Sequence, residues 1–372
     1  MAAGRASAGD ERNGAAPTTV GVVGLGYWGP NLLRVLAEMA DVRVKWTCDL
    51  DRERLGRFRA RYPAVATTRD VEAVLDDSEV DAVFLATPVF THFDLASRAL
   101  RADKHTFVEK PLAPTTEMAE ELRRLADEHD RRLMCGHTFI YSPPVRTLKG
   151  MLERDELGTV FFVSSSRVNL GLHQRDISVV WDLGPHDFSI LLYWLEEMPT
   201  SVRAVGRDSI VRGIPDVAFV TLTFPSGIVA SVELSWLAPS KLRRTVVVGS
   251  EKMVVYDDGT SEPLRIFDHG VVYQDPETFG QYHLAYRTGD ILSPKVATYE
   301  PLVAELADFI GAVRSGASMD WQTRLAKDVV RLTEAADRSL RNGGAEVSVE
   351  RELFASMRPR DRDGAVEGSP IP

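Results

Sequence analysis

Lys110, Asp182 and His186 are the residues whose types and spacing could carry chemistry. A histidine titrates near neutral pH, so it can take the proton of a hydroxyl group. A lysine supplies positive charge beside an oxygen on which negative charge develops. The aspartate lies four residues before the histidine, where it could orient the imidazole if both occupy one helix face. This set suits hydride transfer at an alcohol or ketone carbon. A solvated lysine and a core histidine are the alternative interpretation.

A glycine pattern near the N-terminus predicts a site for a dinucleotide. Gly24, Gly26 and Gly29 fit G-x-G-x-x-G between an apolar strand and a helical run. The first glycine permits a tight turn, the second lets the backbone approach a pyrophosphate, and the third lets helix and strand pack closely. The helix N-terminus adds N–H groups and the positive end of a dipole. Tyr27 and Trp28 lie within the pattern and are candidate cofactor contacts.

Asp49 follows the next predicted strand, 20 residues after Gly29. A carboxylate at this position accepts hydrogen bonds from ribose hydroxyls and repels a 2′-phosphate, which favours NAD. Arg52 and Arg54 follow closely and could serve a 2′-phosphate, so NADP stays possible. A plain strand-end carboxylate in a turn is the alternative interpretation.

The elements around these residues predict two domains of different class. Near-continuous apolar strands at 19–23, 42–48, 82–87, 105–110 and 132–136 alternate with helical runs. This order is typical of a doubly wound parallel sheet covered on both faces. In such a sheet ligands meet the carboxyl ends of the strands, where Pro88 and Pro111 stop two of them sharply. Lys110 therefore should lie beside the cofactor.

After Ser142 the pattern changes to longer strands joined by turn signals, with helical stretches before and after them. Strands at 161–170, 201–207, 218–224, 228–237, 243–249 and 252–258 predict an open, largely antiparallel sheet in an α+β domain. We expect a disordered N-terminus at 1–17, an NAD(P)-binding Rossmann domain at 18–137, a substrate-binding and oligomerisation domain at 138–355 and a disordered tail at 356–372. The cleft between the domains is the default ligand site.

Composition narrows the classes of function. The chain has 372 residues, 44% hydrophobic and 26% charged, with 54 acids against 44 bases for a net charge of −10. A nucleic-acid partner would need a basic excess, so none is expected. Cys48 and Cys135 sit in apolar runs and predict buried free thiols, with no disulfide framework and no metal site. No secretory signal or membrane-length apolar stretch is found, so we expect a cytoplasmic protein.

Five motifs in both predicted domains resemble the glucose-fructose oxidoreductase, inositol dehydrogenase and rhizopine-catabolism (Gfo/Idh/MocA) family. They are GLGYWGPN (24–31), ATPVFTHFDLASRAL (86–100), VEKPLAPT (108–115), GHTFIYSP (136–143) and WDLGPHD (181–187). The resemblance implies an NAD(P)-dependent oxidoreductase with Lys110, Asp182 and His186 as catalytic residues and His186 as proton acceptor. It also implies a homo-oligomer, a dimer or a tetramer. Pro185 departs from the usual family helix and puts the Asp–His geometry in doubt.

The same resemblance implies further cofactor contacts. Substrate contacts are suggested by residue type, and ordinary solvated side chains on strands are the alternative interpretation for them. Residues expected to line the cofactor, besides the glycine turn, Asp49 and Lys110, are Thr87, Pro88, His92, Glu109 and His137. The stretches GHTFIYSP, RVNLG and SWLAPSKLRR are similar to members that act on nucleotide-linked sugars, often at sugar C3. Cationic side chains that could meet a diphosphate are Arg167, Arg175, Lys241 and Arg243, and side chains for sugar hydroxyls are Tyr141 and Asn169.

Four alternatives remain open at this point. The chain could be an NADPH-dependent ketoreductase of a deoxysugar pathway, or a dehydrogenase of inositol or a free sugar. It could also be an NAD-dependent glycosidase that uses transient oxidation. A redox sensor without catalysis is disfavoured, because all three candidate catalytic residue types are present.

Overall fold

The computed structural model describes residues 16–171, 173, 177–273 and 284–349. Most of the two ends predicted to be disordered, and Arg175, lie outside the described residues. Within them no helix is long and apolar enough to cross a membrane. The same described ranges contain no group of three or more His, Cys, Asp or Glu residues that could hold a metal ion. Both cysteines are buried free thiols, as predicted.

The first sheet is fully parallel, with the strand order β3-β2-β1-β4-β5-β6. Its strands are β1 (Thr18–Val23), β2 (Val42–Cys48), β3 (Ala66–Thr68), β4 (Ala82–Leu85), β5 (His105–Glu109) and β6 (Leu133–Gly136). The predicted doubly wound fold is confirmed. The direction of strand addition reverses between β1 and β4, which places the ligand crevice outside their carboxyl ends. The three-residue edge strand β3 is absent from the sequence prediction.

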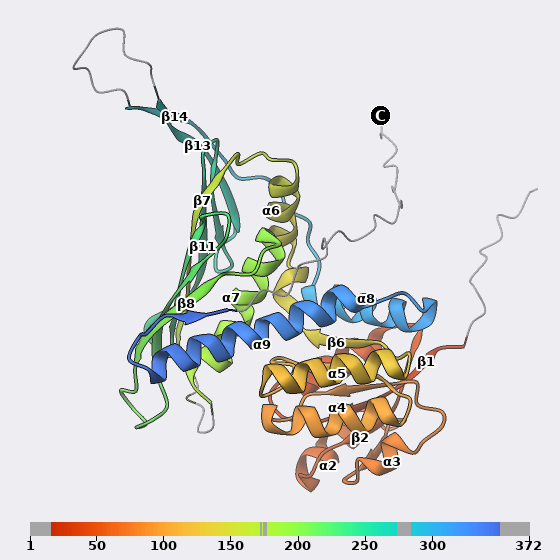
Figure 1. Ribbon diagram of the computed structural model, residues 1–372. Helices are drawn as coiled ribbons and strands as arrows, with labels where there is room; N and C mark the ends of the chain where they lie inside the picture. The colour runs from red at the N-terminus through yellow and green to blue at the C-terminus, as the bar shows by residue number, and fades with distance from the viewer. Residues whose placement is uncertain (1–15, 172, 174–176, 274–283, 350–372) are drawn as a thin grey trace, which may run out of the picture.

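Helices cover both faces of this sheet, which explains its buried strands. They are α1 (Gly29–Glu38), α2 (Arg52–Arg61), α3 (Glu72–Leu75), η1 (Val89–Thr91), α4 (His92–Arg101) and α5 (Thr116–Glu128). A helix from the far end of the chain, α8 (Pro301–Ser315), also joins this core (Figure 1). Its Phe309 ring lies 5.4 Å from Phe84 and 5.7 Å from Phe107, measured between ring centroids.

The second sheet is open and mostly antiparallel, as predicted, in the order β14-β13-β12-β11-β7-β10-β9-β8-β15. Its parallel pair is β7 with β10. Its strands are β7 (Val160–Leu170), β8 (Ser201–Arg207), β9 (Val217–Thr223), β10 (Val229–Ser235), β11 (Leu237–Gly249), β12 (Met253–Asp257), β13 (Leu264–Tyr273), β14 (Leu284–Leu292) and β15 (Val347–Ser348). The last three strands are absent from the sequence prediction.

Helices pack against one face of the second sheet, and Figure 1 shows the other face uncovered. These helices are α6 (Pro143–Glu153), α7 (Val179–Leu195) and α9 (Asp320–Arg341). The short helix η2 (Thr138–Tyr141) precedes them in the chain. Strand β9 shows the consequence: Ala218, Val220 and Leu222 are buried, whereas Phe219 between them is exposed. Helix α9 continues across both units, since Ala326 and Val330 pack in the core of the first sheet.

Substitution by alanine should destabilise the protein at one glycine of the turn after β1 and leave its stability unchanged at another. A Cβ on Gly29 would lie 1.9 Å from the backbone oxygen of Gly24, whereas a Cβ on Gly26 meets nothing within 4 Å. We expect Gly29→Ala to lower the melting temperature, by about 2 °C for each kcal/mol lost in a chain of this size. Gly26→Ala serves as the matched control and should melt near wild type. Melting temperatures are measured by calorimetry, and equal values for the two variants would contradict this packing.

Candidate active site

The glycine turn has the shape that a dinucleotide pyrophosphate needs. Gly24 has φ +93°, a left-handed conformation that favours glycine, and its Cβ would lie 2.5 Å from the carbonyl oxygen of Ala86. The space at Gly26 is open. No side chain caps the N-terminus of α1 and no acidic residue lies in its first turn. The positive end of this helix is therefore available to an anion, and the residues present fit the dinucleotide.

Asp49 anchors the turn as well as the expected ribose position. Its carboxylate accepts the backbone N–H of Leu25 at 2.7 Å and that of Asp51 at 2.8 Å. The side chain is almost fully buried, and Arg54 lies 3.7 Å from it. The carboxylate thus fixes the glycine turn relative to the end of β2, and Arg54 supplies the cation that the sequence places nearby.

Lys110 connects the two sheets. It follows β5, and its Nζ donates to the backbone carbonyl of Asp182 at 2.7 Å and to the Asp182 carboxylate at 3.1 Å. Helix α7 begins at Val179 and runs through Pro185, so Asp182 and His186 occupy successive turns of one face. Pro185 has no N–H for the carbonyl four residues earlier, which loosens the helix at this turn. The carbonyl left without this partner is that of Trp181. Lys110 contacts the next carbonyl along the chain, that of Asp182.

The partners of Asp182 correct one prediction. The carboxylate bonds Lys110 on one oxygen and accepts from Trp236 Nε1 on the other, at 3.1 Å. No hydrogen bond joins it to His186 among the described residues, and Nδ1 of His186 is buried without a partner there. The aspartate therefore holds the lysine and the tryptophan in this structure rather than the imidazole.

His186 sits in an apolar and positively charged setting. Its ring lies edge-on against Phe139, with centroids 4.9 Å apart. Burial, followed by the charges of Lys110 and Arg167, lowers the pKa of His186 well below its usual value. The imidazole is therefore neutral at pH 7 and able to accept a proton.

Behind Lys110 lie two further buried titratable groups. Burial raises the pKa of Glu109 to about 8, and burial together with the Lys110 charge lowers the pKa of His137 to about 3. Both ring nitrogens of His137 have no hydrogen-bond partner among the described residues, and Trp28 lies beside Glu109. Near neutral pH the positive charge of Lys110 thus stands beside two largely neutral groups.

His92 lies between two backbone carbonyl groups. Its ring is buried, with Nδ1 2.8 Å from the carbonyl oxygen of Pro111 and Nε2 2.7 Å from that of Thr87. Burial lowers the pKa of His92, and a neutral imidazole donates from only one nitrogen, so one of these two carbonyls accepts its N–H; the ring lies between the loops that follow β4 and β5. Thr87 and the exposed Pro88 remain at the rim of the crevice.

Several predicted substrate contacts have other partners. Tyr141 is almost fully buried and donates from its hydroxyl to Asp308 at 2.7 Å. Arg167 is buried, and its Nε donates to Asp187. Arg243 pairs with Asp258 at 2.9 Å.

Two predicted contacts stay accessible or unpaired. Lys241 is exposed on β11. Asn169 Oδ1 is buried and has no partner within the described ranges of the chain, so it can accept a hydrogen bond.

Sequence reasoning missed the side chains that form the walls of the site. Phe139 lies under both Arg167 and Arg243, whose guanidinium carbons are 4.4 and 5.2 Å from its ring centroid. Trp236 holds Asp182 and lies 5.3 Å from the ring of His173. Both residues fall inside motifs quoted above, GHTFIYSP and SWLAPSKLRR. That placement was the available signal, but apolar side chains look like ordinary core in a sequence.

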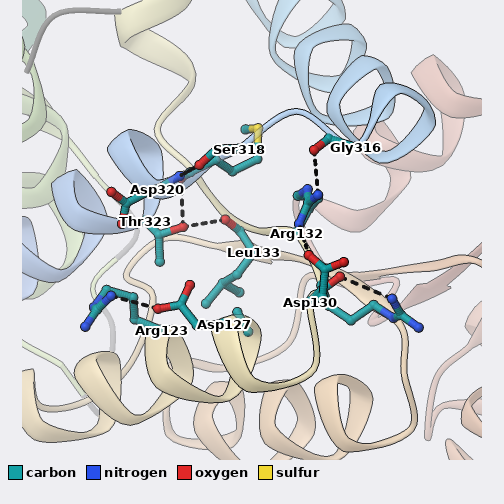
Figure 2. A pocket seen from close by; sticks show the side chains of 12 residues that line it. Arg123, Asp127, Asp130, Arg132, Leu133, Gly316, Ser318, Asp320 and Thr323 are labelled. Carbon is teal, nitrogen blue, oxygen red and sulfur yellow. Dashed lines mark hydrogen bonds and ion pairs between the residues drawn. The ribbon is translucent and has the colours of Figure 1, made fainter.

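A separate hollow of about 310 Å³ lies away from these residues, where β6 begins and α5 ends (Figure 2). Several of its charged side chains pair with one another, Arg123 with Asp127 and Arg132 with Asp130, and Arg132 also donates to the carbonyl of Gly316. It is at the amino end of the strand, opposite the ligand edge of the sheet. We assign no function to it.

The fold and site together define a dinucleotide-dependent oxidoreductase, and comparison with known families agrees. Residues 18–137 match the model "Oxidoreductase family, NAD-binding Rossmann fold", and residues 145–255 match the GFO/IDH/MocA C-terminal domain. Together these cover more than half of the chain. The protein therefore belongs to the Gfo/Idh/MocA family of NAD(P)-dependent oxidoreductases, and its first domain is an NAD-binding Rossmann domain.

Relatives in this family act on different substrates. UDP-N-acetylglucosamine 3-dehydrogenase of Acidithiobacillus ferrooxidans is 29% identical over 67% of this chain and 77% of its own length. Inositol 2-dehydrogenase of Rhizobium meliloti is 25% identical over 86% of this chain and 96% of its own length. The crystal structure of GenD2 from gentamicin A biosynthesis in complex with NAD superposes with a TM-score of 0.77 at 24% identity, covering 91% of this chain and 97% of that one.

The lowered pKa of His186 predicts the acid side of the pH profile. Because the imidazole stays neutral until the pH falls well below 6.5, kcat/KM for alcohol oxidation should remain level from pH 8 through pH 6.5 and decline only at lower pH. Initial rates at saturating NAD between pH 5 and 9 check this. A limb centred at or above the ordinary histidine value would contradict it.

Proposed function

We propose that the protein oxidises a secondary alcohol of a sugar with NAD, or reduces the corresponding ketone. The observation that carries the proposal is the contact between Lys110 and Asp182. It holds the ammonium group of Lys110, which follows β5, against α7, the helix that also contains His186. NAD bound on the glycine turn supplies the hydride acceptor.

The roles follow from the geometry and charge. Neutral His186 takes the hydroxyl proton. Lys110 stabilises the developing negative charge on the substrate oxygen. Asp182 and Trp236 position the lysine. The fixed glycine turn and Asp49 favour NAD over NADP, although Arg54 keeps the second cofactor possible.

A nucleotide-linked sugar is the substrate class that we favour. The support is the resemblance of the motifs around Tyr141, Asn169 and Lys241 to nucleotide-sugar members, together with the A. ferrooxidans relative. A free sugar or inositol is the second candidate, favoured by the R. meliloti relative that spans most of the chain.

We also propose that residues 138–355 carry the oligomer interface. The uncovered face of the second sheet presents exposed apolar side chains in cross-strand pairs, Val205 with Phe219 and Phe162 with Val229. Thr221 and Ser231 separate the two pairs on this face, and exposed large apolar side chains gathered on one sheet face favour an interaction site. A second copy packing against this face gives a dimer or tetramer.

Removing the catalytic side chains should separate chemistry from cofactor binding. We expect His186→Ala and Lys110→Ala each to lower kcat by about 10²-fold or more, because the proton acceptor or the charge beside the oxygen is lost. The NAD dissociation constant, measured by fluorescence, should change little. Near-normal turnover in both variants would refute the assigned roles.

A substrate panel identifies the sugar class. Free sugars, inositols and nucleotide sugars are tested with NAD and NADP while reduced cofactor is followed by absorbance. We expect a higher kcat/KM with a nucleotide sugar than with the same sugar in free form, and with NAD rather than NADP. Equal values with and without the nucleotide would support the free-sugar dehydrogenase instead.

A charged substitution tests the sheet face. Phe219→Glu should shift the protein toward a monomer in light scattering, because the carboxylate cannot be buried unpaired in an apolar interface. Val303→Glu, at an exposed apolar position on α8, is the matched control and should leave the mass unchanged. A wild-type monomer, or an unchanged mass for Phe219→Glu, would exclude this face.

A further inference from the structure

A cleft of about 860 Å³ lies beside the catalytic residues without containing them. It is bounded by the loop after β4, the start of α7, the connection between β8 and β9 and the C-terminal half of α9. Phe90, Trp181 and Ile214 form an apolar wall, and Phe90 is 66% exposed. The glycine turn, Lys110 and His186 do not line it. A cleft of this size with a partly apolar wall suits a small organic ligand.

Helix α7 connects this cleft to the catalytic residues. Ser178, which lines the cleft, precedes the helix, and Asp182 and His186 follow at intervals of four residues. All three therefore lie along one side of α7, with about 12 Å of helix between the first and the last at ~1.5 Å per residue. A substrate that reacts at His186 must extend about this distance along α7 to reach the cleft.

The start of α7 has an unused polar group. Ser178 occupies the N-cap position but makes no side-chain capping bond. It is 7% exposed, and its Oγ has no hydrogen-bond partner among the described residues. A buried hydroxyl without a partner is costly, and a helix N-terminus attracts negative charge. Both features are met by an anionic oxygen bound at this end of the cleft.

Two arginines of the lining are unpaired in the part of the chain that the structure describes. Arg207 and Arg338 line the cleft and are exposed, and neither forms an ion pair with any described residue.

The acidic side chains of the lining each have a partner, although Glu334 and Asp208 accept from neutral groups and keep their charge. Glu334 accepts the N–H and the hydroxyl of Thr116, Asp337 pairs with Arg341 at 2.7 Å, and Asp208 accepts the N–H of Gly213. The two uncommitted guanidinium groups offer the fork of donors that a phosphate binds.

We propose that this cleft binds the phosphate or diphosphate group of the substrate, through Arg207, Arg338 and the Ser178 end of α7, with Trp181 and Phe90 against its organic part. The proposal rests on the proposed function and deepens it. It moves the phosphate contact away from Arg167 and Arg243, because each of these is already paired with a carboxylate.

The kinetic test compares the double variant Arg207→Ala/Arg338→Ala with Arg203→Ala. The control removes an arginine from the same strand, β8, that pairs with Glu346 outside the cleft. We expect the double variant to raise KM for a nucleotide-linked or phosphorylated sugar about tenfold or more, with kcat and the KM for NAD nearly unchanged. The control should match wild type. An unchanged KM in the double variant overturns the proposal.

A binding measurement makes the result independent of turnover. Inorganic pyrophosphate is titrated by calorimetry into protein saturated with NAD, so that the glycine turn is filled. Wild type should bind it and the double variant should bind at least about tenfold more weakly. Equal binding by both overturns the proposal even if no sugar is turned over, which would be a separate failure of the proposed function. Pyrophosphate should also compete with the phosphorylated sugar, and binding without competition would assign the cleft to a free anion and reject the substrate role.

Discussion

The contact between Lys110 and Asp182 holds the proposed chemistry together. The lysine comes from the end of a strand in the first sheet, and the aspartate comes from a helix that packs on the second. Both side chains are about one-fifth exposed, so the pair itself adds little to stability. Its importance is positional. It sets the ammonium group at one place relative to both the cofactor crevice and His186.

That position depends on how the two units are joined. Helix α8 places Phe309 against Phe84 and Phe107 in the first sheet. Helix α9 reaches the first unit through Glu334, which accepts from Thr116, and through Thr323, which donates to the carbonyl of Leu133 at 2.7 Å. Close apolar packing, such as that of Phe309 against the first sheet, is nearly rigid. The C-terminal helices therefore fix the width of the cleft over which Lys110 and Asp182 meet, and a hydride donor and acceptor must be held at such a fixed separation.

The sequence predicted the parts that depend on local patterns. The glycine turn, the strand ends at Thr87 and Lys110, and the helix containing Asp182 and His186 follow from spacing and from proline positions. The edge strands β3 and β15 were missed because strands of two or three residues leave no period to detect.

Side-chain partners were harder to predict, because they come from segments far apart in the chain. Tyr141 reads as a possible sugar contact, but Asp308 from α8 takes its hydroxyl. Arg167 reads as a free cation, but Asp187 lies beside it once β7 packs under α7. The pairing of Asp182 with Trp236 in place of His186 has the same origin. The charge and type of each residue are given by the sequence. Which charged side chains lack an ion-pair partner can be learned only from the folded structure.

A double-mutant cycle on Lys110→Met and Asp182→Asn, measured through kcat/KM at saturating NAD, tests the positional claim most directly. If the aspartate acts by holding the lysine, the double variant should lose no more activity than Lys110→Met alone. Losses that multiply, as for independent residues, would contradict the account.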